Sequence, residues 1–182
     1  MFEQFFRLAD KPLLSNLKHL VLWGWNSEFD ISAFVNRFGQ TLLNLEIRDK
    51  FLDNRVNLNL PKLKTLVLHE PNYSGKYSSS SINCPQLRGL AYYEMYGGRS
   101  LLDVKHPETI RLLDTGMRGP KLAQFRNVDC LVTDEFEVLS KTTLLLLPSL
   151  KEVRFRCGVR SVFIYVFKRE IDSLDRMKRA LK

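Results

Sequence analysis

The stretch that decides the fold is "LPKLKTLVLHEP", residues 60–71. Its leucines at Leu63, Leu66 and Leu68 are spaced by three residues and then by two. An amphipathic helix spaces apolar residues by three and four, and a half-buried strand alternates strictly, so neither pattern explains the whole stretch. It is therefore either one buried strand of a larger sheet or one coil of a structure that repeats.

The same spacing returns along the chain, which favours a repeat. The clear copies are Leu17/Leu20/Leu22, Leu42/Leu45/Ile47, Leu63/Leu66/Leu68, Leu87/Leu90/Tyr92 and Leu150/Val153/Phe155. Two weaker copies are Ile110/Leu113/Thr115, for which the alternating frame Ile110/Leu112/Asp114 fits as well, and Val128/Leu131/Thr133. Successive copies begin 25, 21, 24, 23, 18 and 22 residues apart. Such a period is typical of stacked repeat architectures.

Prolines support this alignment. Pro61, Pro85 and Pro148 each stand two residues before the first apolar position, and Pro107 stands three before Ile110. Proline has no backbone N–H, so it belongs at the entry to a strand, outside the hydrogen-bonded ladder.

These segments resemble a known family. "LPKLKTLVL", "CPQLRGLAY" and "LPSLKEVRF" are similar to the strand segments of leucine-rich repeats, and the resemblance spans about Leu13 to Cys157. Most copies lack the Asn or Cys of the usual repeat turn, so the repeats are irregular. They are most similar to the C-terminal repeats of F-box proteins, where "CPxLxxL" is common.

The expected fold is an α/β solenoid of about seven repeats. Each copy supplies a short strand whose apolar side chains point into the stack, and the stacked strands form a curved parallel sheet on the concave side. Helices and irregular segments return the chain on the convex side. One domain covers residues 1–182, with an N-terminal cap at 1–13, repeats at 14–157 and a C-terminal strand and capping helix at 158–182.

Several connecting segments have specific expectations. "DISAFVNRFG" predicts a helix with Asp30 as N-cap, an apolar face of Phe34, Val35 and Phe38, and Gly39 as terminator. Residues 133–147 predict a second helix, and residues 168–182 an amphipathic helix that caps the stack. "SVFIYVF", residues 161–167, predicts a terminal strand, and "EPNYSGKYSSSS", residues 70–81, predicts a polar flexible loop.

Composition excludes several classes of protein. No apolar run approaches the roughly 20 residues of a membrane span, and the start lacks the basic and apolar regions of a signal peptide. Cys84, Cys130 and Cys157 are an odd number without metal-ligand spacing, which predicts reduced thiols and a cytoplasmic or nuclear location.

No catalytic or metal-binding motif emerges. His19, His69 and His106 lie in different repeats, and the glycine pair at residues 97–98 is a turn rather than a phosphate-binding loop. Cys130 has no partner that would activate it, so an inert buried thiol is expected. The sequence predicts a protein that is not an enzyme and has no cofactor and no bound metal.

What remains is the surface of the sheet. Residues between the apolar positions of each strand point the opposite way, onto the concave face. The predicted partner-binding residues are His19, Trp23, Asn44, Glu46, Arg48, Thr65, His69, Tyr93, Glu152, Arg154 and Arg156. Trp and Tyr near Arg have the composition of a protein-binding hot spot. Trp23 and Trp25 have an alternative interpretation, in which they pack under the N-terminal cap or a loop.

Charge is concentrated at one end. The net charge is +8; ten basic residues oppose four acidic ones from Lys151 onwards, whereas the first 150 residues hold 18 basic and 16 acidic side chains. Arg154, Arg156, Arg160, Lys168 and Arg169 either form a patch for an acidic partner or nucleic acid, or belong to a solvated cap.

Two functions follow as hypotheses. The first is a non-catalytic scaffold that binds a protein partner on the concave sheet; the family resemblance implies substrate recognition for a ubiquitin ligase of the SCF type. The residues before the first repeat, "FEQFFRLADKPL", are fewer than F-box helices need, so an F-box is not expected in this chain. Three alternatives follow: the F-box was lost, the chain is a fragment, or the repeats act alone. The second is binding of nucleic acid or an anionic surface through the basic C-terminal end, with affinity that falls as salt rises.

Overall fold

The structure, a computed structural model of the chain, describes residues 14–23, 30–48, 56–71, 79–95, 101–115, 119–133, 145–157 and 160–165. The large sheet contains β1 (His19–Trp23), β2 (Asn44–Arg48), β4 (Thr65–Pro71), β6 (Gly89–Met95), β8 (Leu112–Thr115), β9 (Cys130–Thr133), β10 (Glu152–Cys157) and β11 (Arg160–Tyr165). A smaller sheet contains β3 (Asn57–Asn59), β5 (Ser79–Asn83) and β7 (Leu101–Val104). Short helices are α2 (Ile31–Asn36), η2 (Pro107–Thr109) and η3 (Gly119–Gln124).

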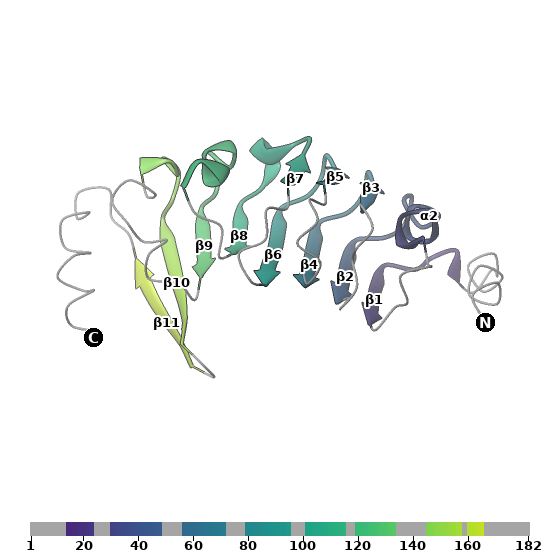
Figure 1. Cartoon of the computed structure of the whole chain (residues 1–182), viewed down its shortest axis with the longest axis horizontal. Helices are drawn as coiled ribbons and strands as arrows, with labels where there is room; N and C mark the ends of the chain where they lie inside the picture. Colours follow the sequence, from purple (N-terminus) through teal and green to yellow (C-terminus); the bar gives the residue numbers. More distant parts are fainter. Residues whose placement is uncertain are drawn as a thin grey trace.

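The chain winds as a mostly parallel β-solenoid, which confirms the predicted architecture at that level. Strands β1, β2, β4, β6, β8, β9 and β10 pair in this order and in parallel. Figure 1 shows them side by side along the long axis of the molecule, with β3, β5 and β7 in a second row beside them. Each parallel step of about 4.8 Å therefore advances the stack by one coil.

The strand register aligns the apolar spacing in space. Leu20, Leu45, Leu66 and Leu90 are successive partners, and the ladder continues through Leu113 to Leu131 and Val153. Ile110, Leu113 and Thr115 are all buried, whereas Leu112 is 36% exposed. The fifth copy therefore uses the three-then-two frame and not the alternating one.

A tight turn precedes most strands of the large sheet. The N–H of the first apolar residue bonds to the carbonyl three residues earlier, as in Leu63 to Leu60 at 3.1 Å and Leu87 to Cys84 at 3.0 Å. Pro61 and Pro85 occupy the second position of these turns, where the fixed φ of proline is favourable. The prediction that proline lies outside the ladder at the strand entry is confirmed. These prolines lie there because they form part of the turn that precedes each strand.

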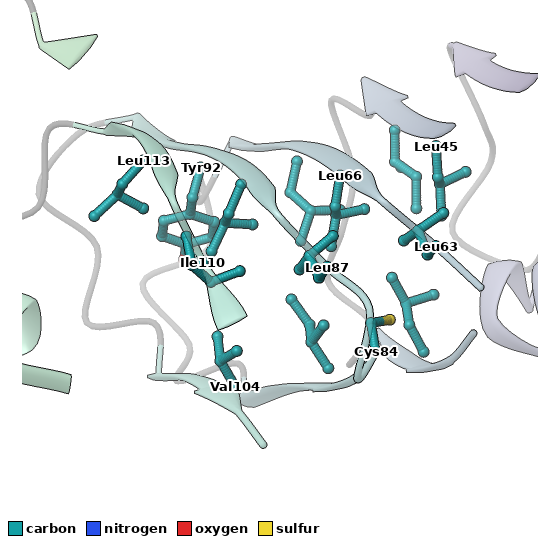
Figure 2. Close-up of a cluster of buried hydrophobic side chains, with 14 of the residues drawn as sticks. Leu45, Leu63, Leu66, Cys84, Leu87, Tyr92, Val104, Ile110 and Leu113 are labelled. Atoms are coloured by element: carbon teal, nitrogen blue, oxygen red, sulfur yellow. The ribbon is translucent and has the colours of Figure 1, made fainter. Parts of the chain in front are cut away.

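The core lies between the two sheets. Figure 2 shows side chains of the large sheet, including Leu45, Leu66 and Tyr92, pointing towards Cys84 and Val104 on the opposite side. Leu66 and Leu90 are completely buried, and Tyr92 is 2% exposed. No single coil can enclose these side chains, so adjacent coils complete the core for one another.

The second sheet corrects the prediction that helices and irregular segments fill the return limbs. Among the described residues, the return limbs hold three short strands, one six-residue α-helix and two 3₁₀ helices. Val56, Leu58 and Leu60 alternate and are buried, as are Ser80, Ile82 and Cys84. This alternation before each turn was a strand signal that the sequence offered.

The predicted loop at residues 70–81 is also corrected. Residues 70 and 71 belong to the end of β4, and residues 79–81 begin β5 in the small sheet, while 72–78 lie outside the described residues. Ser80 is 2% exposed. A serine run that resembles a flexible linker is thus partly recruited into a ladder, because neighbouring strands supply the backbone partners.

Helix α2 confirms the N-cap and the apolar face predicted for residues 30–39, but the helix ends at Asn36 with Arg37 as its C-cap, so the predicted role of Gly39 as terminator is wrong. The Asp30 side chain accepts a hydrogen bond from the Ala33 N–H at 2.9 Å, so Asp30 is the N-cap. Phe34, Val35 and Phe38 are all buried. The added Cβ of any residue at Gly39 would lie 3.1 Å from the Asn59 carbonyl oxygen, so this turn packs closely against β3.

Other predicted segments are described only in part. The N-terminal cap at 1–13, the capping helix at 168–182 and most of the second predicted helix lie outside the described residues. The predicted terminal strand is present as β11, which pairs antiparallel with β10 and reverses the direction of the sheet at its end.

A ladder of polar side chains joins the return limbs. The side-chain Oδ1 of Asn36 accepts from the backbone N–H of Asn59 at 2.8 Å, and Nδ2 of Asn83 donates to Oδ1 of Asn59 at 3.1 Å. The Asn83 oxygen then lies 3.2 Å from Nε2 of His106. These residues recur 23 or 24 positions apart, so they fix the separation of successive coils.

Candidate functional site

The candidate site is the face of the large sheet that points away from the core, called here the open face. Its side chains form three rows that run across the strands. The first row is His19, Asn44, Thr65, Gly89, Leu112, Cys130 and Glu152; the second is Val21, Glu46, Val67, Ala91, Asp114, Val132 and Arg154; the third is Trp23, Arg48, His69 and Tyr93. Ten of the eleven predicted residues belong to these rows; the side chain of the eleventh, Arg156, lies outside the described residues.

The third row carries aromatic and cationic side chains on four adjacent strands. Trp23 is 64% exposed, and the guanidinium carbon of Arg48 lies 4.8 Å from the centroid of its ring. This contact decides between the two interpretations of Trp23: the ring faces solvent on the open face. Trp25 lies outside the described residues.

The row continues with a pair of stacked rings. The rings of His69 and Tyr93 are stacked, with centroids 4.6 Å apart and planes inclined by 23°. The hydroxyl of Tyr93 donates to the carboxylate of Asp114 on the next strand. Asp114 is not among the predicted residues because two frames fit the fifth copy equally well in the sequence; the spacing Ile110/Leu113/Thr115 places Asp114 outward.

A shallow depression of about 470 Å³ lies over the middle of this arrangement. Its lining residues are Glu46, Arg48, Val67, His69, Ala91, Tyr93 and Asp114. Val67 and Ala91 supply an apolar floor, and the other side chains supply a polar and aromatic rim. An apolar centre with a polar rim is the usual anatomy of a protein interface.

The first row is held by hydrogen bonds between strands. The Thr65 hydroxyl donates to Oδ1 of Asn44, and Nδ2 of Asn44 lies 2.8 Å from Nδ1 of His19. Because Oδ1 is occupied as an acceptor by Thr65, the amide nitrogen faces His19 as a donor. These three predicted residues are thus brought into one network.

Two ion pairs lie within single strands. Glu46 pairs with Arg48 on β2, and Glu152 pairs with Arg154 on β10 at 2.9 Å. Residues two apart in a strand share a face, which brings each pair together. Exposed pairs of this kind contribute little stability, but they orient the guanidinium groups.

The predicted residues separate into two groups. Those on β1, β2, β4 and β6 lie on adjacent strands, whereas Glu152 and Arg154 lie on β10, beyond β8 and β9. Three strand steps put β10 about 14 Å from β6. The predicted basic patch is described only at Arg154, whose guanidinium is bonded to Glu152; Lys168 and Arg169 lie outside the described residues.

The two described cysteines differ in position but share a raised pKa. Burial raises the pKa of the Cys84 thiol to about 11. Burial also raises the pKa of Cys130; the charge of Arg154 lowers it, and the carboxylates of Glu152 and Asp114 raise it further. Both are free thiols that hold their protons at neutral pH, in agreement with the expectation of an inert buried thiol at Cys130.

Within the parts of the chain that the structure describes, no three side chains of His, Cys, Asp or Glu gather as a possible metal site. Over the same residues, no helix is long and apolar enough to cross a membrane.

Comparisons of the whole chain with protein-family models, with curated proteins and with solved structures find no match.

Proposed function

We propose that this chain is an irregular leucine-rich-repeat protein of about seven repeats and acts as a non-catalytic scaffold that binds a protein partner on the open face. The supporting observation is the third row, in which Trp23, Arg48, His69 and Tyr93 form two preorganised contacts across four adjacent strands. Trp, Tyr and Arg are the residues most enriched at binding hot spots.

The energetic support comes from preorganisation. A side chain that is ordered before binding loses less rotamer entropy when the partner arrives. Arg48 is held by both Glu46 and the Trp23 ring, and Tyr93 is held by both His69 and Asp114. The exposed aromatic area is therefore presented at low entropic cost.

The shape of the site favours a macromolecular partner over a small molecule. Small ligands are usually enclosed over most of their surface. The depression over Val67 and Ala91 is shallow, and apolar surface continues beside it at Val21, which is 55% exposed. An extended contact area of this kind suits another protein.

The test compares the wild-type chain with the double variant Trp23→Ala/Tyr93→Ala in affinity capture with mass spectrometry, followed by calorimetry with each purified partner. Loss of two hot-spot residues should weaken the affinity by at least about 30-fold, which corresponds to about 2 kcal/mol.

Leu145→Ala is the matched control, because Leu145 is 63% exposed and lies outside the three rows, while Trp23 is 64% exposed. The control should retain every partner. A set of partners that binds the double variant as tightly as the wild type would overturn the proposal.

The family resemblance extends the proposal to substrate recognition for a ubiquitin ligase. In that case the captured proteins include a Skp-type adaptor or other ligase subunits, together with a target that needs the open face. Capture of a partner by the open face without any ligase subunit would reject this extension and retain the scaffold.

A further inference from the structure

The strand-entry edge of the large sheet is a second surface, distinct from the open face. It consists of the turn before each strand and the residue that directly precedes the strand. Its described members are residues 15–18, 40–43, 61–64, 85–88, 108–111, 126–129 and 148–151. Because β1, β2, β4, β6, β8, β9 and β10 pair in parallel, all these segments meet at one edge of the large sheet.

Positive charge is concentrated at this edge. Its cations are Lys18, Lys62, Lys64, Arg88, Arg111, Arg126 and Lys151, and its carboxylates are Glu108 and Asp129. The first 150 residues hold 18 basic and 16 acidic side chains, so without the edge they would be slightly acidic. The modest net charge of this region conceals a strongly asymmetric distribution.

One of the two carboxylates at the edge is already engaged. Asp129 pairs with Lys151 at 3.1 Å, whereas Glu108 lies 3.5 Å from Nδ1 of His106, which is an ion pair only when His106 is protonated. Lys18, Lys62, Lys64 and Arg126 are exposed, and within the described residues none of them forms an ion pair. The charge at the edge is therefore largely uncompensated.

The cations occupy a fixed and regular frame. Lys64, Arg88 and Arg111 precede the adjacent strands β4, β6 and β8, so their backbones are spaced by about 4.8 Å. The Lys64 carbonyl accepts from the N–H groups of both Arg88 and Gly89, at 2.8 and 3.0 Å. In the same way, the Arg88 carbonyl accepts hydrogen bonds from the N–H groups of both Arg111 and Leu112.

The arginines are fixed further by their own side chains. Nη1 of Arg88 donates to the Thr109 carbonyl at 3.3 Å, and Nη1 of Arg111 donates to the Asn127 carbonyl at 3.0 Å. Each guanidinium has five N–H donors, so donors remain for a ligand after this contact.

We propose that the strand-entry edge binds an extended acidic peptide segment, rich in Asp or Glu, of a protein partner. Lys64, Arg88 and Arg111 form a continuous row whose long side chains can each reach a carboxylate of one extended chain in a charge-assisted hydrogen bond. Neutral amides beside the row, such as Asn16 and Gln86, can both donate to and accept from a peptide backbone. This surface is separate from the open face, and its occupancy does not depend on the function proposed above.

Nucleic acid fits the edge less well. Single strands are bound by cations together with aromatic side chains on which the bases stack. The edge segments contain no Phe, Tyr or Trp, and the exposed Trp23 and the Tyr93 ring lie at the far ends of their strands. A double helix needs a broader basic surface than one row of residues.

The test measures fluorescence anisotropy of a labelled peptide of alternating Glu and Gly, titrated with the full chain at low and high salt. Two labelled probes serve for comparison. One is a peptide of alternating Gln and Gly, and the other is a single-stranded oligothymidylate with the same net charge as the acidic peptide. We expect the acidic peptide to bind, the Gln peptide not to bind, and the affinity for the acidic peptide to fall as salt rises.

The variant Lys62→Glu/Lys64→Glu should weaken binding of the acidic peptide by about tenfold or more. These lysines form no ion pair within the described residues, so the change should leave the far-ultraviolet circular dichroism unaltered. Lys105→Glu is the control for a single exposed lysine outside the edge and should change affinity less than about twofold. Arg88→Lys/Arg111→Lys keeps the charge but loses the fixed guanidinium donors, so it should weaken binding less than Lys62→Glu/Lys64→Glu does.

Failure of the acidic peptide to bind, or equal binding by wild type and Lys62→Glu/Lys64→Glu, would overturn the proposal. Oligothymidylate that binds at least tenfold more tightly than the peptide would also overturn it, in favour of a nucleic-acid surface. Trp23→Ala/Tyr93→Ala should bind the acidic peptide as well as wild type does, which separates this edge from the open face.

Discussion

The two faces of the large sheet differ in composition, although successive residues of the same strands contribute to each face in turn. On the inner face, Leu45, Leu66 and Leu90 lie in register and are buried, with similar apolar residues on either side. On the open face the neighbouring positions range from Asn44 to Thr65 to Gly89. The stack constrains the inner face because each coil completes the core of the next, whereas the open face is free to carry function.

The largest expected difference between the faces is in stability. Leu66→Ala should lower the free energy of unfolding by about 3 kcal/mol, since Leu66 is completely buried between coils. Val67→Ala, one residue along on the open face, should cost less than about 1 kcal/mol. Urea denaturation of both variants measures the difference, and equal losses would mean that the two faces are not distinguished by packing.

The cysteines offer an intermediate test, because Cys84 lies in the core and Cys130 on the open face. Burial raises the pKa of Cys84 to about 11 from 9.0. The folded state therefore retains the proton where the unfolded chain loses it, and the stabilisation present below pH 9 is lost as pH rises towards 11.

The free energy of unfolding should be measured for wild type and Cys84→Ala from pH 8 to pH 11. The advantage of wild type should shrink over this window by roughly 2 kcal/mol. Cys130→Ala should show a smaller change, because Cys130 is less deeply buried, at 9% exposed against 2% for Cys84. An advantage for wild type over Cys84→Ala that stays constant with pH would contradict the buried position of the thiol.

The smallest expected effect concerns contacts within the open face. The cation–π contact of Arg48 with Trp23 should give a coupling energy of about 0.5–1 kcal/mol in a double-mutant cycle on stability, using Trp23→Ala and Arg48→Ala. Arg48→Lys should retain part of it. Additive losses would show that the two side chains do not contact each other in solution.

Much of the fold was predictable from the sequence because the inner face repeats a simple pattern. The three-then-two spacing identified the parallel strands, and Asp30 with its apolar partners identified helix α2. The small sheet was missed although Val56, Leu58 and Leu60 alternate, since strands of three to five residues give a weak signal beside a stronger one.

The candidate site was predictable as a set of positions but not as a set of contacts. Alternation placed Trp23, Arg48 and Tyr93 on one face, whereas the link from Tyr93 to Asp114 depends on the register of the fifth copy. The strand-entry edge was missed because its lysines and arginines are single residues about one repeat apart, and only stacking brings them together.

The sequence by itself determined which side chains enter the core, because the period of a strand separates its two faces and burial selects the apolar one. Only the tertiary structure decided which outward residues meet. The hydrogen-bond register between β1, β2, β4, β6 and β8 brings together residues that are about one repeat apart in the sequence. It thereby forms the aromatic contacts of the open face and the row of cations at the strand-entry edge.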